Sequence, residues 1–204
     1  MKDIYFITAT NTDVGKSYAS EVFLKKFASM GKKVGYLKPI ETGVEDNKPL
    51  DGTKLLKIAT SLNSDFKVSI KDVVPYQFSL AAAPYVADIY SVVDIDLIIK
   101  QIKYLLNFCD TLIIEGAGGL MVPIKENYFI IDLIKDIQDI YNSQTILISP
   151  SNLGSINDTM LSQKALESYS INYEWYINLY KDKDSFDEIT LPFYESCFNT
   201  IQFL

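Results

Sequence analysis

The chain has 204 residues, of which 48% are hydrophobic and 22% are charged, as in an ordinary globular domain. Its formal net charge of −7 argues against non-specific binding of nucleic acid, which requires a basic surface. The absence of histidine excludes Ser-His-Asp and Cys-His catalysis and every histidine-ligated metal site.

The first part of the chain alternates between short apolar segments and longer amphipathic ones. Residues 4–8 have the pattern of a buried strand, and residues 17–30 that of an amphipathic helix ending at Gly31. A second strand is predicted at 34–38. A further helix is predicted from Asp51, which is a plausible N-cap residue.

The region from residue 64 to 93 is harder to interpret. "VVPYQF" (73–78) is compatible with a short strand, and "SLAAAPYVADIY" (79–90) with a short helix broken at Pro84. From Asp94, "DIDLIIKQIKYLLNF" places apolar residues at helical spacing and predicts a helix.

The second half continues the alternation. The predicted elements are a strand at 111–116 that ends in a Gly-rich loop, a helix at 128–142, a strand at 144–149, a helix at 155–169 and a strand at 173–180. Strands that alternate with helices predict an α/β fold, with a mostly parallel sheet flanked by helices on both faces. We expect residues 1–204 to form a single domain.

Unusual polar clusters follow the predicted strands. Ligands of such sheets bind beyond the carboxyl ends of the strands, so these clusters are expected to meet along one edge. They are the Gly15-Lys16-Ser17 loop, Lys38 with "PIETG", Glu115 with "GAGG", "SPSNLGSIN" and Asn178.

The first cluster resembles a phosphate-binding P-loop. Free backbone N–H groups at the start of the following helix would face an anion, Lys16 would reach the β- and γ-phosphates, and Ser17 would bind Mg²⁺. The usual P-loop pattern has a glycine where this chain has Thr10. The alternative is an ordinary helix start with a solvated Lys and Ser.

Two further strand ends carry charged residues. Lys38 would stand beside the phosphate held by Lys16, although a lysine before proline is often only a surface residue. Glu115 ends an apolar strand, as the magnesium-binding acid of a Walker B motif does, and a tight turn is the alternative for the glycines after it. Asp51 is compatible both with helix capping and with a hard-cation site.

Together these segments resemble the dethiobiotin synthetase family of P-loop NTPase-like enzymes. The resemblance rests on "TATNTDVGKS", "LKPIETG" and "EGAGGLMVP", and it extends through "SNLGSIND" and "INL" to about residue 180. The phosphate loop of that family begins with a glycine where this chain has Ala9.

The resemblance implies roles for individual residues. Lys16 and Lys38 would be catalytic. The nucleotide would be bound by Thr12, Asp13, Val14, Gly15, Lys16, Ser17, Tyr18, Glu115, Gly118 and Asn178, with Asn178 reading adenine. Mg²⁺ would be bound by Ser17, Asp51 and Glu115. The substrate would be bound by Thr42, Gly116, Gly118 and Gly119, and by Leu153, Gly154, Ser155 and Asn157 of the other subunit of a homodimer.

The reaction implied by the resemblance uses ATP, CO₂ or bicarbonate, and 7,8-diaminopelargonate. A carbamate formed on one amine attacks the γ-phosphate, and the second amine then closes the ureido ring of dethiobiotin. The alternatives are a P-loop ATPase switch of the partitioning or septum-site type and a nucleotide-binding module without this activity. Against the switch, residues 4–15 contain no lysine, and "CFNTIQFL" has no basic residue for membrane binding.

The location is predicted from what the sequence lacks. Cys109 and Cys197 follow no disulfide or metal spacing, the N-terminus has no signal-peptide pattern, and no apolar run reaches the roughly 18 residues of a membrane span. We therefore expect a cytoplasmic protein without a membrane or nucleic-acid partner.

Overall fold

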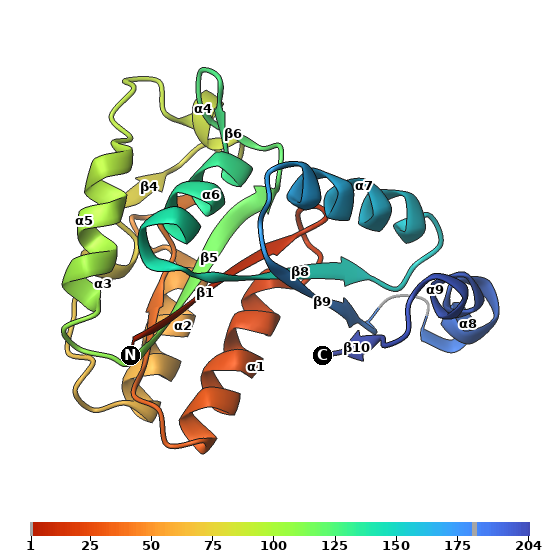
Figure 1. The fold of residues 1–204 in the computed structure, drawn as a ribbon. Helices are drawn as coiled ribbons and strands as arrows, with labels where there is room; N and C mark the ends of the chain where they lie inside the picture. The colour runs from red at the N-terminus through yellow and green to blue at the C-terminus, as the bar shows by residue number, and fades with distance from the viewer. Residues whose placement is uncertain (1, 181–182) are drawn as a thin grey trace.

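The computed structural model describes residues 2–180 and 183–204, with a six-stranded parallel sheet at its centre (Figure 1). In spatial order its strands are β10 (Gln202–Phe203), β9 (Tyr173–Asn178), β8 (Gln144–Pro150), β1 (Asp3–Ala9), β5 (Thr111–Gly119) and β2 (Val34–Leu37). Every neighbouring pair is parallel. The predicted α/β fold is confirmed, and the five longer predicted strands all belong to this sheet.

Helices cover both faces of the sheet. Figure 1 shows α1 (Lys16–Ser29) and α2 (Leu50–Leu62) on one face, and α6 (Ile130–Tyr141) and α7 (Ser155–Ser168) on the other. The helix predicted from Asp94 is α5 (Ile95–Leu105). The connections between the parallel strands therefore follow the βαβ pattern that the sequence predicts.

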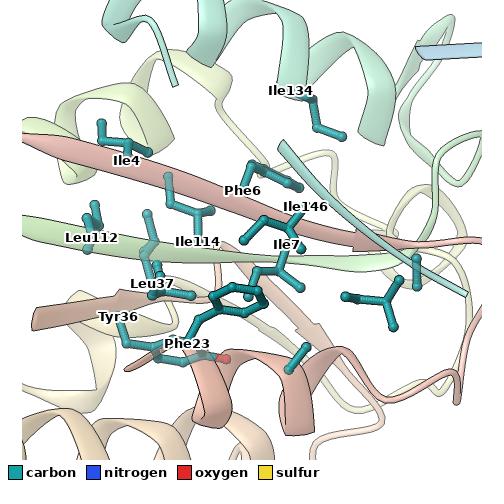
Figure 2. Packing of buried hydrophobic residues seen from close by; sticks show 14 of the residues in the cluster. Ile4, Phe6, Ile7, Phe23, Tyr36, Leu37, Leu112, Ile114, Ile134 and Ile146 are labelled. Atoms are coloured by element: carbon teal, nitrogen blue, oxygen red, sulfur yellow. The ribbon is translucent and has the colours of Figure 1, made fainter. Parts of the chain in front are cut away.

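The core lies between these layers. In β1, Phe6 and Ile7 are both fully buried and point to opposite faces, as successive residues of a strand must. Figure 2 shows Ile134 of α6 on the side of Phe6, and Phe23 of α1 on the other side of β1. Because both faces are covered, the central strands are apolar almost throughout.

The region at 64–93 contains three short elements, α3 (Ile70–Val73), β4 (Tyr76–Phe78) and α4 (Pro84–Ala87), and β4 pairs with β3 (Ile40–Thr42). The short strand predicted at 73–78 is therefore present in its second half. The predicted break at Pro84 is wrong, because α4 begins at this residue. Proline is suited to the first turn of a helix, where its missing N–H has no partner to lose.

Two predicted boundaries also differ from the structure. The N-cap of α2 is Pro49, so Asp51 lies inside the first turn and does not cap this helix. β5 continues to Gly119, through residues predicted to form a loop after 116, because Gly119 still pairs with Ala9 of β1. β5 is followed by the antiparallel pair β6 (Pro123–Lys125) and β7 (Tyr128–Phe129).

The C-terminal segment, for which the sequence predicts no elements, forms α8 (Lys183–Ile189), α9 (Leu191–Cys197) and β10. Trp175 of β9 packs against Tyr194 and Phe198, with ring centroids 4.8 and 5.0 Å away.

Across the described part of the chain, no helix is both long enough and apolar enough to cross a bilayer.

Candidate active site at the carboxyl edge of the sheet

A cavity of about 800 Å³ opens at the carboxyl ends of β1, β2, β5 and β9. It brings together most of the residues predicted for the site: Thr12, Asp13, Gly15, Lys16, Ser17, Tyr18, Lys38, Thr42, Asp51, Glu115, Gly116, Gly118 and Asn178. The cavity is also lined by Ile40, Glu41, Ala117, Leu179, Tyr180, Lys183 and Leu204. The predicted residues at the strand ends therefore lie around a common space.

The other predicted residues do not line this cavity. Val14 is buried in the core, and Gly119 pairs with β1. Leu153, Gly154, Ser155 and Asn157 lie at the start of α7. Leu153 is 72% exposed, whereas Ser155 is 2% exposed and its N–H donates to the carbonyl of Asn152.

The phosphate loop ends at Gly15, the N-cap of α1, with a φ of 101°. Lys16 begins the helix, is 8% exposed, and donates from Nζ to the carbonyl of Asn11 at 3.1 Å. Burial lowers the pKa of Lys16 to about 8, although Glu115 acts in the opposite direction. An anion beside this ammonium group would replace hydration that burial has removed.

Glu115 is the most enclosed charged residue of the site, with no exposed surface. Its Oε1 accepts from Ser17 Oγ at 2.8 Å and from Lys38 Nζ at 2.9 Å. Its Oε2 accepts from Ser20 Oγ at 2.8 Å and from Tyr36 OH at 2.9 Å. Four donors of this kind compensate for the desolvation of the carboxylate.

Lys38 lies between two carboxylates. Its Nζ is 2.9 Å from Glu115 Oε1 and 2.6 Å from Asp51 Oδ2, and the residue is 6% exposed. Burial alone would lower the pKa of Lys38, but Glu115 and Asp51 outweigh it and raise the pKa above its ordinary value. Lys38 therefore carries a fixed positive charge in the cavity and is not suited to accept a proton.

The oxygen atoms around Lys38 also fit a hard divalent cation. Burial would raise the pKa of Asp51, but Lys38 and then the Ser17 hydroxyl lower it, so Ser17 lies close to both acids. Mg²⁺ favours one or two carboxylates together with phosphate and water oxygens. The described residues contain no group of three or more acidic or cysteine side chains arranged for a metal, so such oxygens would have to complete the coordination.

Three residues that hold Glu115 and the start of α2 in place were not predicted from the sequence. Tyr36 and Ser20 bind Glu115, and Glu41 accepts from the backbone N–H groups of Asp51 at 3.1 Å and of Gly52 at 2.9 Å. Glu41 thus supplies the carboxylate at the start of α2 that was predicted from Asp51, and the Asp51 side chain binds Lys38 instead. Ser20, three residues after Ser17 on one helix face, was detectable from spacing.

The sequence is similar to characterised families along nearly its whole length. It is 46% identical over 194 residues to the ATP-dependent dethiobiotin synthetase BioD of Sulfurovum sp. (strain NBC37-1), covering 95% of this chain and 90% of that relative. The chain belongs to the dethiobiotin synthetase family. A second family member, from Wolinella succinogenes, is 35% identical over 193 residues, covering 93% and 87% of the two chains. The predicted resemblance is confirmed.

More distant comparisons agree on the fold of the family. A family model described as an AAA domain matches residues 3–177. A plasmid partition protein from Borrelia burgdorferi has a TM-score of 0.57 at 16% identity, covering 100% of this chain and 89% of that one. The MinC:MinD cell division protein complex of Aquifex aeolicus gives 0.52 at 17% identity, covering 91% and 72%. These structures share the P-loop NTPase fold, and at such identities they indicate nothing more.

Proposed function

We propose that the chain is an ATP- and Mg²⁺-dependent cyclo-ligase of biotin biosynthesis. It would convert 7,8-diaminopelargonate, CO₂ and ATP into dethiobiotin, ADP and phosphate. The identity of 46% to a dethiobiotin synthetase over 95% of the chain carries this proposal. The cavity supports it, because two lysines and an oxygen-rich group lie together beside the phosphate loop.

The proposed reaction begins when one amine of the substrate takes up CO₂ and releases a proton, giving a carbamate. A carbamate oxygen attacks the γ-phosphorus of ATP, and the bond to ADP breaks. The second amine then attacks the carbonyl carbon of the mixed anhydride, closes the ureido ring and expels phosphate. The nucleophile is already an anion, so this histidine-free chain needs no strong base, only positioning and charge neutralisation.

Different residues around the cavity would bind the phosphates, the reacting groups and the metal ion. Lys16 and the backbone N–H groups at the start of α1 would bind the phosphates. Lys38, whose charge is fixed by Glu115 and Asp51, would face the carbamate and the transferred phosphoryl group, beside Thr42. The amides of Gly116 and Gly118, which also line the cavity, would bind the same reacting groups. Mg²⁺ bound by Ser17, Asp51 and Glu115 would neutralise phosphate charge.

The substrate carboxylate is proposed to bind at the start of α7 of a second subunit. Leu153, Gly154 and Asn157 are exposed there, and they do not line the cavity of their own chain. A homodimer would bring this helix start to the partner's cavity. The reaction is placed in the cytoplasm, in keeping with two free cysteines, Cys109 and Cys197.

The assay that tests this function is release of phosphate from Mg-ATP with bicarbonate, with and without 7,8-diaminopelargonate. We expect release to depend on the diamine, and labelled carbon from bicarbonate to enter an acid-stable product. Slow release that is indifferent to the diamine would contradict the ligase and favour a switch ATPase, the alternative whose fold the MinD and partition structures share.

The lowered pKa of Lys16 predicts a pH dependence of nucleotide binding. Free Lys16 loses its proton as the pH rises through about 8, and the neutral amine attracts phosphate less. From pH 7 to pH 9 the affinity of the unmodified protein for metal-free ATP is expected to fall about tenfold more than that of Lys16→Met. Each pH unit above the pKa removes most of the remaining charged form of Lys16. Calorimetry at both pH values measures the two affinities. Parallel pH profiles of the two proteins would contradict this prediction.

A further inference from the structure

The end of β9 contacts the phosphate loop at two points. Asn178, the last residue of β9, is 6% exposed, and its Nδ2 donates to the carbonyl oxygen of Val14 at 2.9 Å. The hydroxyl of Tyr180 donates to the carbonyl oxygen of Asp13. Asn178 and Val14 are 164 positions apart in the sequence, so only the folded sheet brings these groups together.

The contacted loop has an uncommon backbone conformation. Asp13 has a φ of 54° and Gly15 a φ of 101°, both in the left-handed region. Residues other than glycine remain there only when their surroundings hold them. Asn178 lies directly against this backbone, since a Cβ added at Gly15 would be 2.2 Å from Asn178 Nδ2. Asn178 at the end of β9 and Tyr180 two residues after it are therefore placed where the loop requires support.

These contacts also orient two N–H groups. The C=O and N–H of a planar trans peptide point in opposite directions. Binding the Asp13 carbonyl to Tyr180 therefore turns the Val14 N–H away from Tyr180, and binding the Val14 carbonyl to Asn178 turns the Gly15 N–H away from Asn178. Within residues 2–180 and 183–204, neither N–H donates to another protein group. Successive free N–H groups beside a helix start form an anion-binding site.

We propose that Asn178 and Tyr180 are positioning residues that hold the phosphate loop in its anion-binding conformation. This rests on the proposed nucleotide site, and it gives Asn178 a role other than the adenine reading that the family resemblance implies. A residue that recognises adenine would affect the binding of ATP selectively. A residue that orients the loop acts on every polyphosphate alike, including one without a base.

The test uses Asn178→Ala and Tyr180→Phe with three probes: Mg-ATP, Mg-GTP and inorganic tripolyphosphate with Mg²⁺. We expect each variant to bind all three probes about tenfold more weakly, which is the usual effect of one lost hydrogen bond. Tyr176→Phe is the matched control. Tyr176 lies on β9, and its hydroxyl binds Glu174 and not the loop. The affinity of this variant for tripolyphosphate is expected to stay unchanged.

Amide hydrogen exchange supplies a readout that general destabilisation would not give. Saturating Mg-tripolyphosphate is expected to slow exchange at Val14 and Gly15 less in both variants than in the unmodified protein, at an unchanged unfolding midpoint for Tyr180→Phe, which is 45% exposed. A loss confined to ATP, with tripolyphosphate binding intact, would overturn the proposal and return Asn178 to base reading. Failure of the unmodified protein to bind any probe would instead overturn the proposed nucleotide site.

Discussion

Replacing Lys38 with alanine is expected to lower turnover about a thousandfold while Mg-ATP still binds, since removal of one preorganised charge or donor from a reacting centre has effects of this size. The fixed charge of Lys38 faces the cavity between Glu115 and Asp51, whereas the start of α1 and Lys16 would provide the proposed phosphate contacts. Diamine-dependent phosphate release measures turnover, and calorimetry measures nucleotide affinity. Lost nucleotide binding in this variant would assign Lys38 to the phosphates.

The same variant should be less stable. Ser17, Ser20 and Tyr36 would still bind Glu115, but its buried carboxylate would have lost its cation. Removing one partner of a buried ion pair lowers the free energy of unfolding by about 3–5 kcal/mol. Because three donors to Glu115 remain, we expect a decrease near the lower end of this range. Added Mg²⁺ should restore part of the unfolding midpoint if the two acids bind it, and no recovery would contradict the proposed metal site.

Lys33→Ala is the matched control for these measurements. Lys33 precedes β2 as Lys38 follows it. It pairs with Asp65 at 2.6 Å, but the side chains of both Lys33 and Asp65 are more than half exposed. Pairs of this kind add little to stability. We expect turnover, nucleotide binding and the unfolding midpoint of Lys33→Ala to match those of the unmodified protein.

The position of the site was predictable because it follows from strand order. Parallel strands put their carboxyl ends at one edge, so Lys16, Lys38 and Glu115 could be expected around one cavity before any side chain was placed. The types of residue then indicated the chemistry. The alternation of apolar strands and amphipathic helices, which is the strongest signal in the sequence, is sufficient to predict this arrangement.

The connections between side chains were not predictable. Asp51 has a residue type suited to capping but lies inside the first turn of α2, and Glu41, ten positions earlier, accepts from the N–H groups at the start of this helix. This arrangement depends on β3 passing the start of α2, which no local pattern encodes. Tyr36 gave no signal either, because a tyrosine inside an apolar strand is normally a core residue, and only the position of Glu115 makes its hydroxyl functional.

The C-terminal segment shows a different limit. α8 and α9 have seven residues each, too few for a helical period to stand out, and α9 is held by aromatic contacts with β9. Its short helices form because of tertiary packing and not because of propensity. The sequence therefore gave little indication that Lys183 and Leu204 would line the cavity beside Asn178.

Fold similarity and sequence similarity have different weight for function here. The MinD and plasmid partition structures share the fold, so the fold alone does not distinguish a switch ATPase from a ligase. Lys38, Thr42 and Gly118 line the cavity. In the proposed reaction they would bind a second substrate beside the phosphates, which a ligase requires and a nucleotide switch does not.

Replacing Gly15 with alanine is expected to weaken Mg-ATP binding at least about a hundredfold, the effect of losing two or more hydrogen bonds to the phosphates. An added Cβ would lie 2.2 Å from Asn178 Nδ2, and the φ of 101° is itself unfavourable for alanine. Either the loop or Asn178 must move, and movement of either one disturbs the N–H groups proposed to bind the phosphates. Calorimetry gives the affinity, and thermal unfolding gives the stability.

Two further variants separate the causes of that loss. Gly31 has a φ of 80° with nothing within 4 Å of an added Cβ, so Gly31→Ala carries only the backbone cost, about 1 kcal/mol, and should bind ATP normally. Gly15→Ala combined with Asn178→Ala removes the close contact, and should regain stability without regaining full affinity, because the loop has then lost its support from β9. Normal ATP binding by Gly15→Ala alone would mean that Asn178 can withdraw without consequence, so the loop would not depend on it.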